Sequence, residues 1–119
     1  MHADERLDHA FSALSDPTRR AILARLAQGS ATVAELGEPF GFSQPTISKH
    51  LRVLEEAGFI EQARDAQKRP RRLVVGGPMR DIDHWLAPFR KEWEGRFDRL
   101  DSFLQKSQPK TRRPKGGSR

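Results

Sequence analysis

The sequence predicts a mainly α-helical fold with one β-hairpin. Three observations predict it. Amphipathic helical patterns fill residues 5–58, two short segments of β character follow within residues 59–75, and a long apolar periodicity runs from residue 78 to residue 104. Apolar residues recur every three to four positions in a helix, whereas strands are short, β-branched and bounded by turn residues. The chain is therefore expected to form several helices, then a hairpin, then one long helix.

Length and composition indicate one intracellular domain. At 119 residues the chain can bury a core of its own. We expect this domain at residues 1–106, followed by a disordered basic tail at 107–119, which has Pro, Gly and charge but no apolar residue. No cysteine is present, which excludes disulfides, thiolate metal sites and a cysteine nucleophile. Without a signal segment or an apolar run that could cross a bilayer, the protein is expected to be cytoplasmic.

Positive charge is concentrated at the C-terminus. The chain contains 22 Lys and Arg against 16 Asp and Glu, a net charge of +6. Residues 108–119 hold five basic residues and no acidic one, which leaves residues 1–107 with only +1. A basic balance suggests a polyanionic partner such as nucleic acid. Any nucleic-acid-binding surface in the domain must therefore be a local patch.

The first two helices are expected to meet at Ser15-Asp16-Pro17. Asp16 is a favourable N-cap, Pro17 suits the first helical position, and Gly29 stops the second helix. Arg19 and Arg20 lie near its start, where the helix dipole does not favour cations. An ion pair that holds helices together is the favoured interpretation, with a phosphate contact as the alternative. The apolar residues at helical spacing are Leu7, Ala10, Phe11, Leu14, Ile22, Leu23 and Leu26.

A third, short helix is predicted to begin at a capping box. Thr32 is the N-cap and Glu35 is the acidic residue three positions later. Pro39 and Gly41 break this helix, and the next one is capped by Ser43. A short helix, a turn of about four residues and a second, capped helix is the spacing of a helix-turn-helix.

The second helix of this motif covers residues 43–58. Pro45 lies in its first turn, Gly58 ends it, and a narrow apolar stripe faces the core at Ile47, Leu51 and Leu54. The opposite face carries amide, hydroxyl and cationic groups, which are the groups that contact base edges in a major groove. An ordinary amphipathic surface helix is the alternative, and the elements on either side of the helix distinguish the two interpretations. The outward residues are Gln44, Ser48 and Arg52, flanked by Pro45 and Lys49.

A basic hairpin is predicted directly after that helix. Residues 59–64 and 71–75 are the candidate strands, and five basic residues between Arg64 and Arg72 face one acid, Asp65. A hairpin in this place is a wing, which could contact the flanking DNA backbone or minor groove. The alternative is a solvated hairpin with an incidental charge run. The cations expected to reach outward are Lys68, Arg69 and Arg71.

The last helix carries more apolar surface than one small core can use. Its periodicity runs through Pro88, so a helix kinked there is expected, with two separate helices as the second choice. The surplus is expected to be buried against another copy of the chain, the alternative being a helix that caps its own domain. The stripe consists of Ile82, Trp85, Leu86, Phe89, Trp93, Phe97, Leu100 and Leu104.

Three motifs resemble a known family. Residues 14–23 (LSDPTRRAIL), 43–51 (SQPTISKHL) and 54–60 (LEEAGFI) are similar to those of the arsenical-resistance-repressor (ArsR) family of bacterial winged helix-turn-helix regulators. The resemblance covers residues 7 to about 104. It implies a homodimer paired through its first and last helices, which binds a palindromic operator and usually represses transcription.

The resemblance also implies site residues. Together with the polar face and the basic hairpin, it assigns DNA binding to Ser43, Gln44, Pro45, Thr46, Ser48, Lys49, His50, Arg52, Arg64, Lys68, Arg69 and Arg71. In this assignment Gln44, Pro45, Ser48 and Lys49 enter the major groove, and His50 and Arg52 border it. The dimer interface is assigned to Leu7, Phe11, Trp85, Phe89, Trp93, Phe97, Leu100 and Leu104.

Metal sensing is where the sequence departs from the family. Many members bind a metal through cysteines in the third helix, and residues 33–37 (VAELG) offer no ligand. Another kind of site uses Asp and His on the last helix, but the spacing here does not reproduce its pattern. No cofactor is expected, a zinc-responsive repressor is the alternative, and the effector is unknown. The residues that resemble such ligands are Asp81, Asp83, His84, Glu92 and Glu94.

Other classes of function fit less well. No Gly-rich phosphate loop, no Ser/His/Asp arrangement and no His with ligand-spaced partners is present, so an enzyme is not expected. A winged-helix module for protein contacts is the more serious rival. The one-sided charge of the hairpin argues against it, and steeply salt-dependent DNA binding would separate the two.

Overall fold

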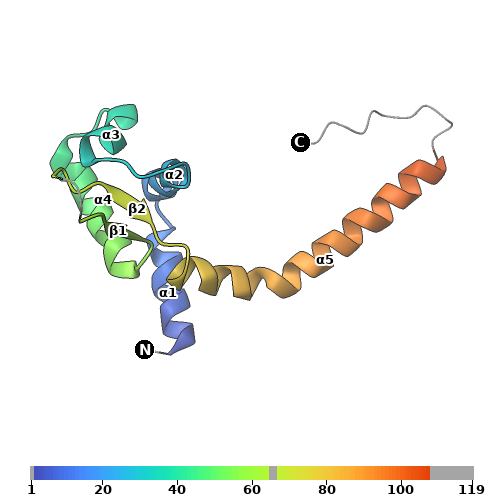
Figure 1. The fold of residues 1–119 in the computed structure, drawn as a ribbon. Helices are drawn as coiled ribbons and strands as arrows, with labels where there is room; N and C mark the ends of the chain where they lie inside the picture. The colour runs from blue at the N-terminus through green and yellow to red at the C-terminus, as the bar shows by residue number, and fades with distance from the viewer. Residues whose placement is uncertain (1, 65–66, 108–119) are drawn as a thin grey trace. The chain divides into compact units, whose positions relative to one another are not determined.

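The computed structural model describes residues 2–64 and 67–107. The chain divides into two compact units, residues 1–85 and the chain from Leu86 onward. Among the described residues no helix is both long and apolar enough to cross a membrane. The tail expected at 107–119 lies outside the described residues, except for Ser107, which belongs to the last helix. In chain order the elements are α1 (Ala3–Ala13), α2 (Pro17–Leu26), α3 (Val33–Gly37), the 3-10 helix η1 (Glu38–Phe40), α4 (Gln44–Ala57), β1 (Ile60–Gln62), β2 (Arg71–Leu73) and α5 (Gly77–Ser107) (Figure 1).

The capping residues expected from the sequence begin the helices. The Asp16 carboxylate accepts the backbone N–H of Arg19 at 3.0 Å and caps α2. Thr32 and Glu35 form a reciprocal box at α3, with backbone to side-chain distances of 3.2 and 2.8 Å. Each cap satisfies amides that the first helical turn leaves without partners. These bonds fix where α2 and α3 start.

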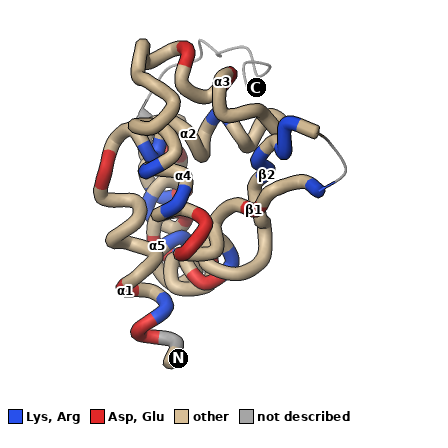
Figure 2. Tube along the Cα trace, turned by 90° about the vertical axis from the view of Figure 1, so that its left-hand side faces the viewer, with Lys and Arg blue, Asp and Glu red and all other residues tan. Residues whose placement is uncertain are grey.

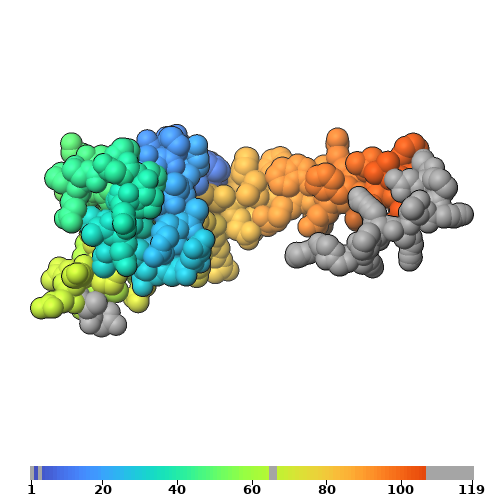
Figure 3. Space-filling view, turned by 90° about the horizontal axis from the view of Figure 1, so that it is seen from above, coloured from blue at the N-terminus to red at the C-terminus, as the bar shows by residue number. Residues whose placement is uncertain are grey.

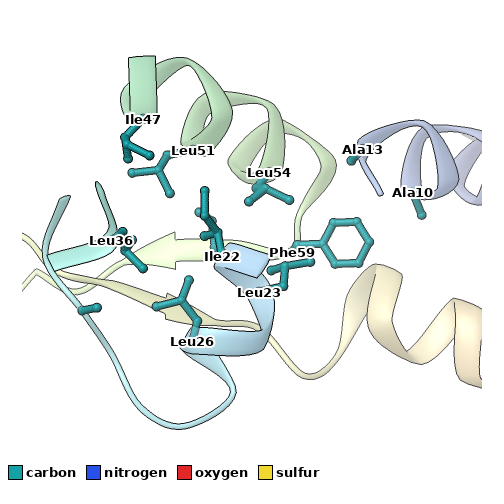
Figure 4. Packing of buried hydrophobic residues seen from close by; sticks show 12 residues of the cluster. Ala10, Ala13, Ile22, Leu23, Leu26, Leu36, Ile47, Leu51, Leu54 and Phe59 are labelled. Atoms are coloured by element: carbon teal, nitrogen blue, oxygen red, sulfur yellow. The ribbon is translucent and has the colours of Figure 1, made fainter. Parts of the chain in front are cut away.

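The hydrophobic core lies between the helices of the first unit. The apolar stripe of α4 points at α2, and Leu36 of α3 closes the cluster from the side (Figure 4). Phe59, directly after α4, is fully buried in the same cluster. The predicted inward faces of α2 and α4 are confirmed by the buried residues Ile22, Leu23, Leu26, Ile47, Leu51 and Leu54.

The turn between α3 and α4 is tight. Its middle is η1, where the sequence predicted only a break between helices, and Gly41 closes the turn with a φ of 67°. A Cβ on Gly37 would lie 3.0 Å from Cγ1 of Ile47, so α3 and α4 approach closely where Gly37 has no side chain. The turn therefore holds the start of α4 close against α3.

The β-hairpin is antiparallel and pairs Ile60 with Leu73 and Gln62 with Arg71. Ala31, in the segment between α2 and α3, adds a single bridge to Arg71 through two backbone bonds of 2.8 and 3.0 Å. This third contact was not expected, because one bridging residue leaves no alternating pattern in the sequence. The bridge ties the base of the hairpin to the helical core.

The last helix is continuous from Gly77 to Ser107 and contains Pro88 in its interior. The prediction that the helix continues through Pro88 is confirmed, and the alternative of two separate helices is wrong. The kink expected at this residue stays a prediction.

Candidate nucleic-acid interface

The N-terminal half of α4 presents a polar and cationic surface. From Gly41 to Leu54 the sequence contains no acidic residue, and the first turn of α4 has none either. Ser48 is half-buried, at the edge of this surface. The helix N-terminus adds partial positive charge from its amides. The surface therefore favours a polyanion, and its exposed members include Gln44, Pro45, Lys49 and Arg52.

Two of the predicted DNA-binding hydroxyls already have a structural task. Ser43 Oγ accepts the backbone N–H of Thr46 at 3.4 Å, and the hydroxyls of Ser43 and Thr46 lie 3.0 Å apart. Both side chains remain exposed. Ser43 caps α4 and the Thr46 hydroxyl supports that cap, which gives the polar face a defined starting point.

His50 faces the start of α2 rather than solvent alone. Its side chain is 20% exposed, and its Nδ1 lies 3.4 Å from Nη1 of Arg19 and 3.8 Å from Oδ2 of Asp16. The pKa of Asp16 is lowered, mainly because its carboxylate accepts the Arg19 amide, and the charges of His50 and Arg19 lower it further. His50 thus joins α4 to the cap of α2, at the border of the polar face.

Arg19 and Arg20 bind main-chain carbonyls at the end of α1. Arg19 Nε donates to Ala13 O at 2.6 Å, and Arg20 Nη1 donates to Leu14 O at 2.7 Å. The sequence favoured an ion pair between helices. The two arginines do hold helices together, but through carbonyl oxygens that the end of α1 leaves without helical partners.

The hairpin supplies a second basic surface. Arg64, Lys68 and Arg69 are exposed, and basic positions mark the hairpin in Figure 2. In the space-filling view the hairpin, in yellow-green, projects from the helices of the first unit (Figure 3). Arg72 is also exposed but is paired with Glu61 at 2.7 Å. Three of the four predicted wing cations are therefore available to an approaching phosphate.

Arg71 is different from the other three. Its side chain is only 14% exposed, and its Nε donates to Oε2 of Glu55 in α4 at 2.8 Å. Arg71 was expected on the outer surface because it belongs to the same charge run. The alternation of β2 turns the Arg71 side chain inward, so the expectation that it reaches outward is wrong.

Phe42 is an exposed aromatic residue that sequence analysis did not single out. It directly precedes the cap of α4, its ring is 42% exposed, and it stacks on Phe40 with a centroid distance of 5.5 Å. Aromatic residues at this edge can contact thymine methyl groups. Its position directly before the Ser43 cap is the sequence signal that could have identified it as a DNA-binding candidate.

Exposed apolar residues form a second kind of surface. In the first unit, Phe11 and Trp85 meet edge to face at 5.6 Å while both remain more than two-fifths exposed, and Leu7 is half-buried. In the second unit, the described part of α5 exposes the predicted residues Phe89, Trp93, Phe97, Leu100 and Leu104. It also exposes Phe103 (64%), which the 3–4 spacing of the stripe had passed over.

The residues considered for zinc do not gather. Asp81 pairs with Arg6, with Nε and Oδ2 3.1 Å apart. Within residues 2–64 and 67–107, no three His, Cys, Asp or Glu side chains are grouped so that they could hold a metal ion.

The short helix α3, the tight turn, the capped helix α4 and the hairpin behind it together form a winged helix-turn-helix, the architecture of a class of DNA-binding domains. Comparison with known proteins agrees. A helix-turn-helix domain family matches residues 14–63. A crystal structure of an ArsR family transcriptional regulator superposes with a TM-score of 0.64 at 39% identity, over 75% of this chain and 97% of that one.

Two named relatives share the same region. The transcriptional repressor SdpR of Bacillus subtilis is 43% identical over 61 residues, 51% of this chain and 68% of its own length. A probable mercury resistance operon repressor of Streptomyces lividans is 43% identical over 68 residues, 57% of this chain and 53% of its own length. The chain spans about half the length of the second relative.

The chain belongs to the ArsR family of winged helix-turn-helix DNA-binding transcriptional regulators. The expected fold class and family are thereby confirmed.

Proposed function

We propose that this protein is a homodimeric transcriptional repressor that binds a palindromic operator without requiring a metal. One observation carries the proposal: the acid-free, exposed face of α4 begins at a defined cap and is accompanied by a basic hairpin. SdpR is named a transcriptional repressor and the Streptomyces protein a probable operon repressor, which supports repression as the direction of regulation.

Within the proposal, helix and hairpin have different tasks. Gln44, Ser48 and Lys49 contact base edges in the major groove, with Pro45 and Arg52 beside them, because amide, hydroxyl and cationic groups match base-edge donors and acceptors. Arg64, Lys68 and Arg69 contact phosphates, which contributes affinity without sequence preference. Ser43 and Thr46 fix the start of the helix, and His50 fixes its packing. In these roles α4 is the recognition helix and the β1–β2 hairpin is the wing.

The apolar surface supports the dimer. A monomer does not usually leave so many large aromatic residues in water, and a second copy would cover them by the same surface on both subunits. Dimerisation would place two recognition helices on half-sites about one helical turn apart, roughly 34–36 Å. The proposed interface combines Leu7, Phe11 and Trp85 with the α5 residues Phe89, Trp93, Phe97, Leu100, Phe103 and Leu104.

The test is binding to the duplex immediately upstream of the coding region, compared with a scrambled duplex, at several salt concentrations. We expect specific binding whose logarithm falls linearly with the logarithm of salt concentration. Transcription from that promoter should fall when the protein is added. Equal affinity for the scrambled duplex would contradict the proposal and favour the protein-contact module.

Metal independence needs its own arm of this experiment. The same titrations are repeated with a chelator and with added zinc, and operator affinity should be unchanged in both. Release of the operator by zinc would instead favour the zinc-responsive alternative, and would direct attention to Asp81, His84 and their neighbours on α5, acting between two subunits.

A further inference from the structure

Arg71 connects three parts of the DNA-binding unit at once. Its backbone pairs with Ala31 through bonds of 2.8 and 3.0 Å, which holds it against the core. Its Nε donates to Glu55 in the recognition helix at 2.8 Å, and its Nη1 donates to the carbonyl of Arg69 in the wing turn, also at 2.8 Å. One guanidinium thus spans the space between recognition helix and wing.

In the wing turn, the Arg71 side chain binds a residue with a strained backbone, Arg69. Arg69 has a φ of 46°, and among the described residues it is the one non-glycine residue with a positive φ. It also precedes Pro70, and a proline restricts the preceding residue to extended conformations. Such conformations persist only where surrounding contacts hold them. The bond from Arg71 to the Arg69 carbonyl is a contact of that kind.

At the recognition helix, the Arg71 side chain shares its acceptor, Glu55, with a second donor. Glu55 Oε2 accepts from Arg71 and, at 3.4 Å, from Nε2 of Gln62 on β1. Glu55 lies in the last turns of the recognition helix, with its side chain 26% exposed. Partial burial strengthens such a charged bond compared with one on an open surface. Both strands of the wing are therefore bound to one carboxylate of the recognition helix.

We propose that Arg71 is a positioning residue for DNA binding, which holds the wing to the recognition helix so that Lys68 and Arg69 meet the phosphate backbone while the helix occupies the major groove. The inference rests on the proposed function and deepens it. It assigns to Glu55, an acidic residue beside a DNA-binding surface, a favourable contribution to DNA affinity.

The chain contains a matched control for this proposal. Arg72 and Glu61 form a second arginine–glutamate pair on the neighbouring register position, but their side chains are about half exposed. Replacing Arg71 or Arg72 by Met removes the same charge from adjacent residues. If charge alone mattered, the two variants would lose the same affinity, and replacing either glutamate would tighten binding.

The experiment measures operator affinity of the full chain for Arg71→Met, Arg72→Met, Glu55→Ala, Glu61→Ala and Glu55→Gln. We expect Arg71→Met and Glu55→Ala to weaken binding roughly tenfold, the scale of coupling between residues in contact. Glu61→Ala should bind as tightly as the unsubstituted protein or tighter. Glu55→Gln should retain affinity, because its amide oxygen still accepts from Arg71. Tighter binding by Glu55→Ala would overturn the proposal.

A double-substitution cycle separates positioning from general stability. Arg69→Ala should weaken binding and flatten the salt dependence in the unsubstituted protein, but should have little further effect once Arg71 is Met. Additive losses would overturn the proposal. Thermal unfolding shows which variants are folded at the binding temperature, and Glu55→Ala replaces Arg71→Met in the cycle if the latter is not. Failure of the unsubstituted protein to prefer its operator would overturn the proposed function itself, and this inference with it.

Discussion

The recognition helix α4 and the C-terminal helix α5 are both amphipathic, but the apolar stripe of α4 is buried whereas that of α5 is exposed. Ile47, Leu51 and Leu54 of α4 are at most 1% exposed, whereas Trp93 and Phe97 of α5 are 48% and 68% exposed. The same periodicity therefore describes a helix covered by its own chain and a helix that the described part of the chain leaves exposed. Amphipathic spacing shows which face is buried, and the number of other apolar residues in the chain shows whether that chain can bury it.

The comparison predicts that the largest loss of stability comes from α4. Leu51→Ala should lower the free energy of unfolding by about 2–5 kcal/mol, because it leaves a cavity in a packed core. Trp93→Ala removes a larger side chain and should cost far less at concentrations where the protein is monomeric. Urea unfolding at low and high protein concentration measures both. A comparable loss for Trp93→Ala in dilute monomer would contradict the distinction between the two stripes.

The next effect concerns assembly. Trp93→Glu or Phe97→Glu should convert dimers to monomers, because each places a charge without a partner in the proposed interface. Light scattering after size-exclusion chromatography measures the mass. Val75→Glu, at an exposed apolar residue outside the proposed interface, is the control and should remain dimeric. If both the Trp93→Glu and the Phe97→Glu variants remained dimeric, these two residues would not lie in the dimer interface.

Smaller effects should distinguish the recognition helix from the wing. Gln44→Ala is expected to cost about 1–3 kcal/mol of operator binding and to relax specificity at one base pair in each half-site. Lys68→Ala should weaken binding to all sequences similarly and reduce the slope of the salt dependence by about one. Titration of single-base operator variants measures both. A changed base preference in Lys68→Ala, with none in Gln44→Ala, would reverse the two roles.

The smallest predicted effects concern the caps of α2 and α3. The pKa of Asp16 and that of Glu35 are lowered in the folded protein, chiefly by backbone N–H groups that donate to them. Both carboxylates therefore stabilise the fold above their unfolded pKa values, near 3.8 and 4.5, and this contribution is lost as the pH falls below that range. Asp16→Asn keeps a capping acceptor and should flatten the acid limb of the unfolding curve; an unchanged limb would contradict this.

Much of the fold could be predicted from local chemistry. Asp16, Thr32, Ser43 and Gly58 act on the nearest turn of backbone, so their capping roles are visible in short stretches of sequence. The helix-turn-helix spacing and the wing followed from the order of these signals. The family resemblance then identified the class.

The inward turn of Arg71 could not be predicted in the same way. Its partners Ala31 and Glu55 are 40 and 16 residues away along the chain, and the charge run around it pointed outward. His50 is similar, because its contact with Arg19 depends on how α2 packs against α4. Both are contacts between elements, and a charge or hydropathy pattern within one element does not contain them.

The distribution of charge along α4 has a kinetic consequence. Lys49 and Arg52 lie in a stretch without acids, whereas Glu55 in the last turns is paired with Arg71, so the positive charge of α4 is concentrated before its last turns. In the electric field of a polyanion, this uneven charge distribution turns the protein as well as attracting it. Encounters with DNA should therefore begin with the correct end forward, and the association rate should fall steeply as ionic strength screens that field.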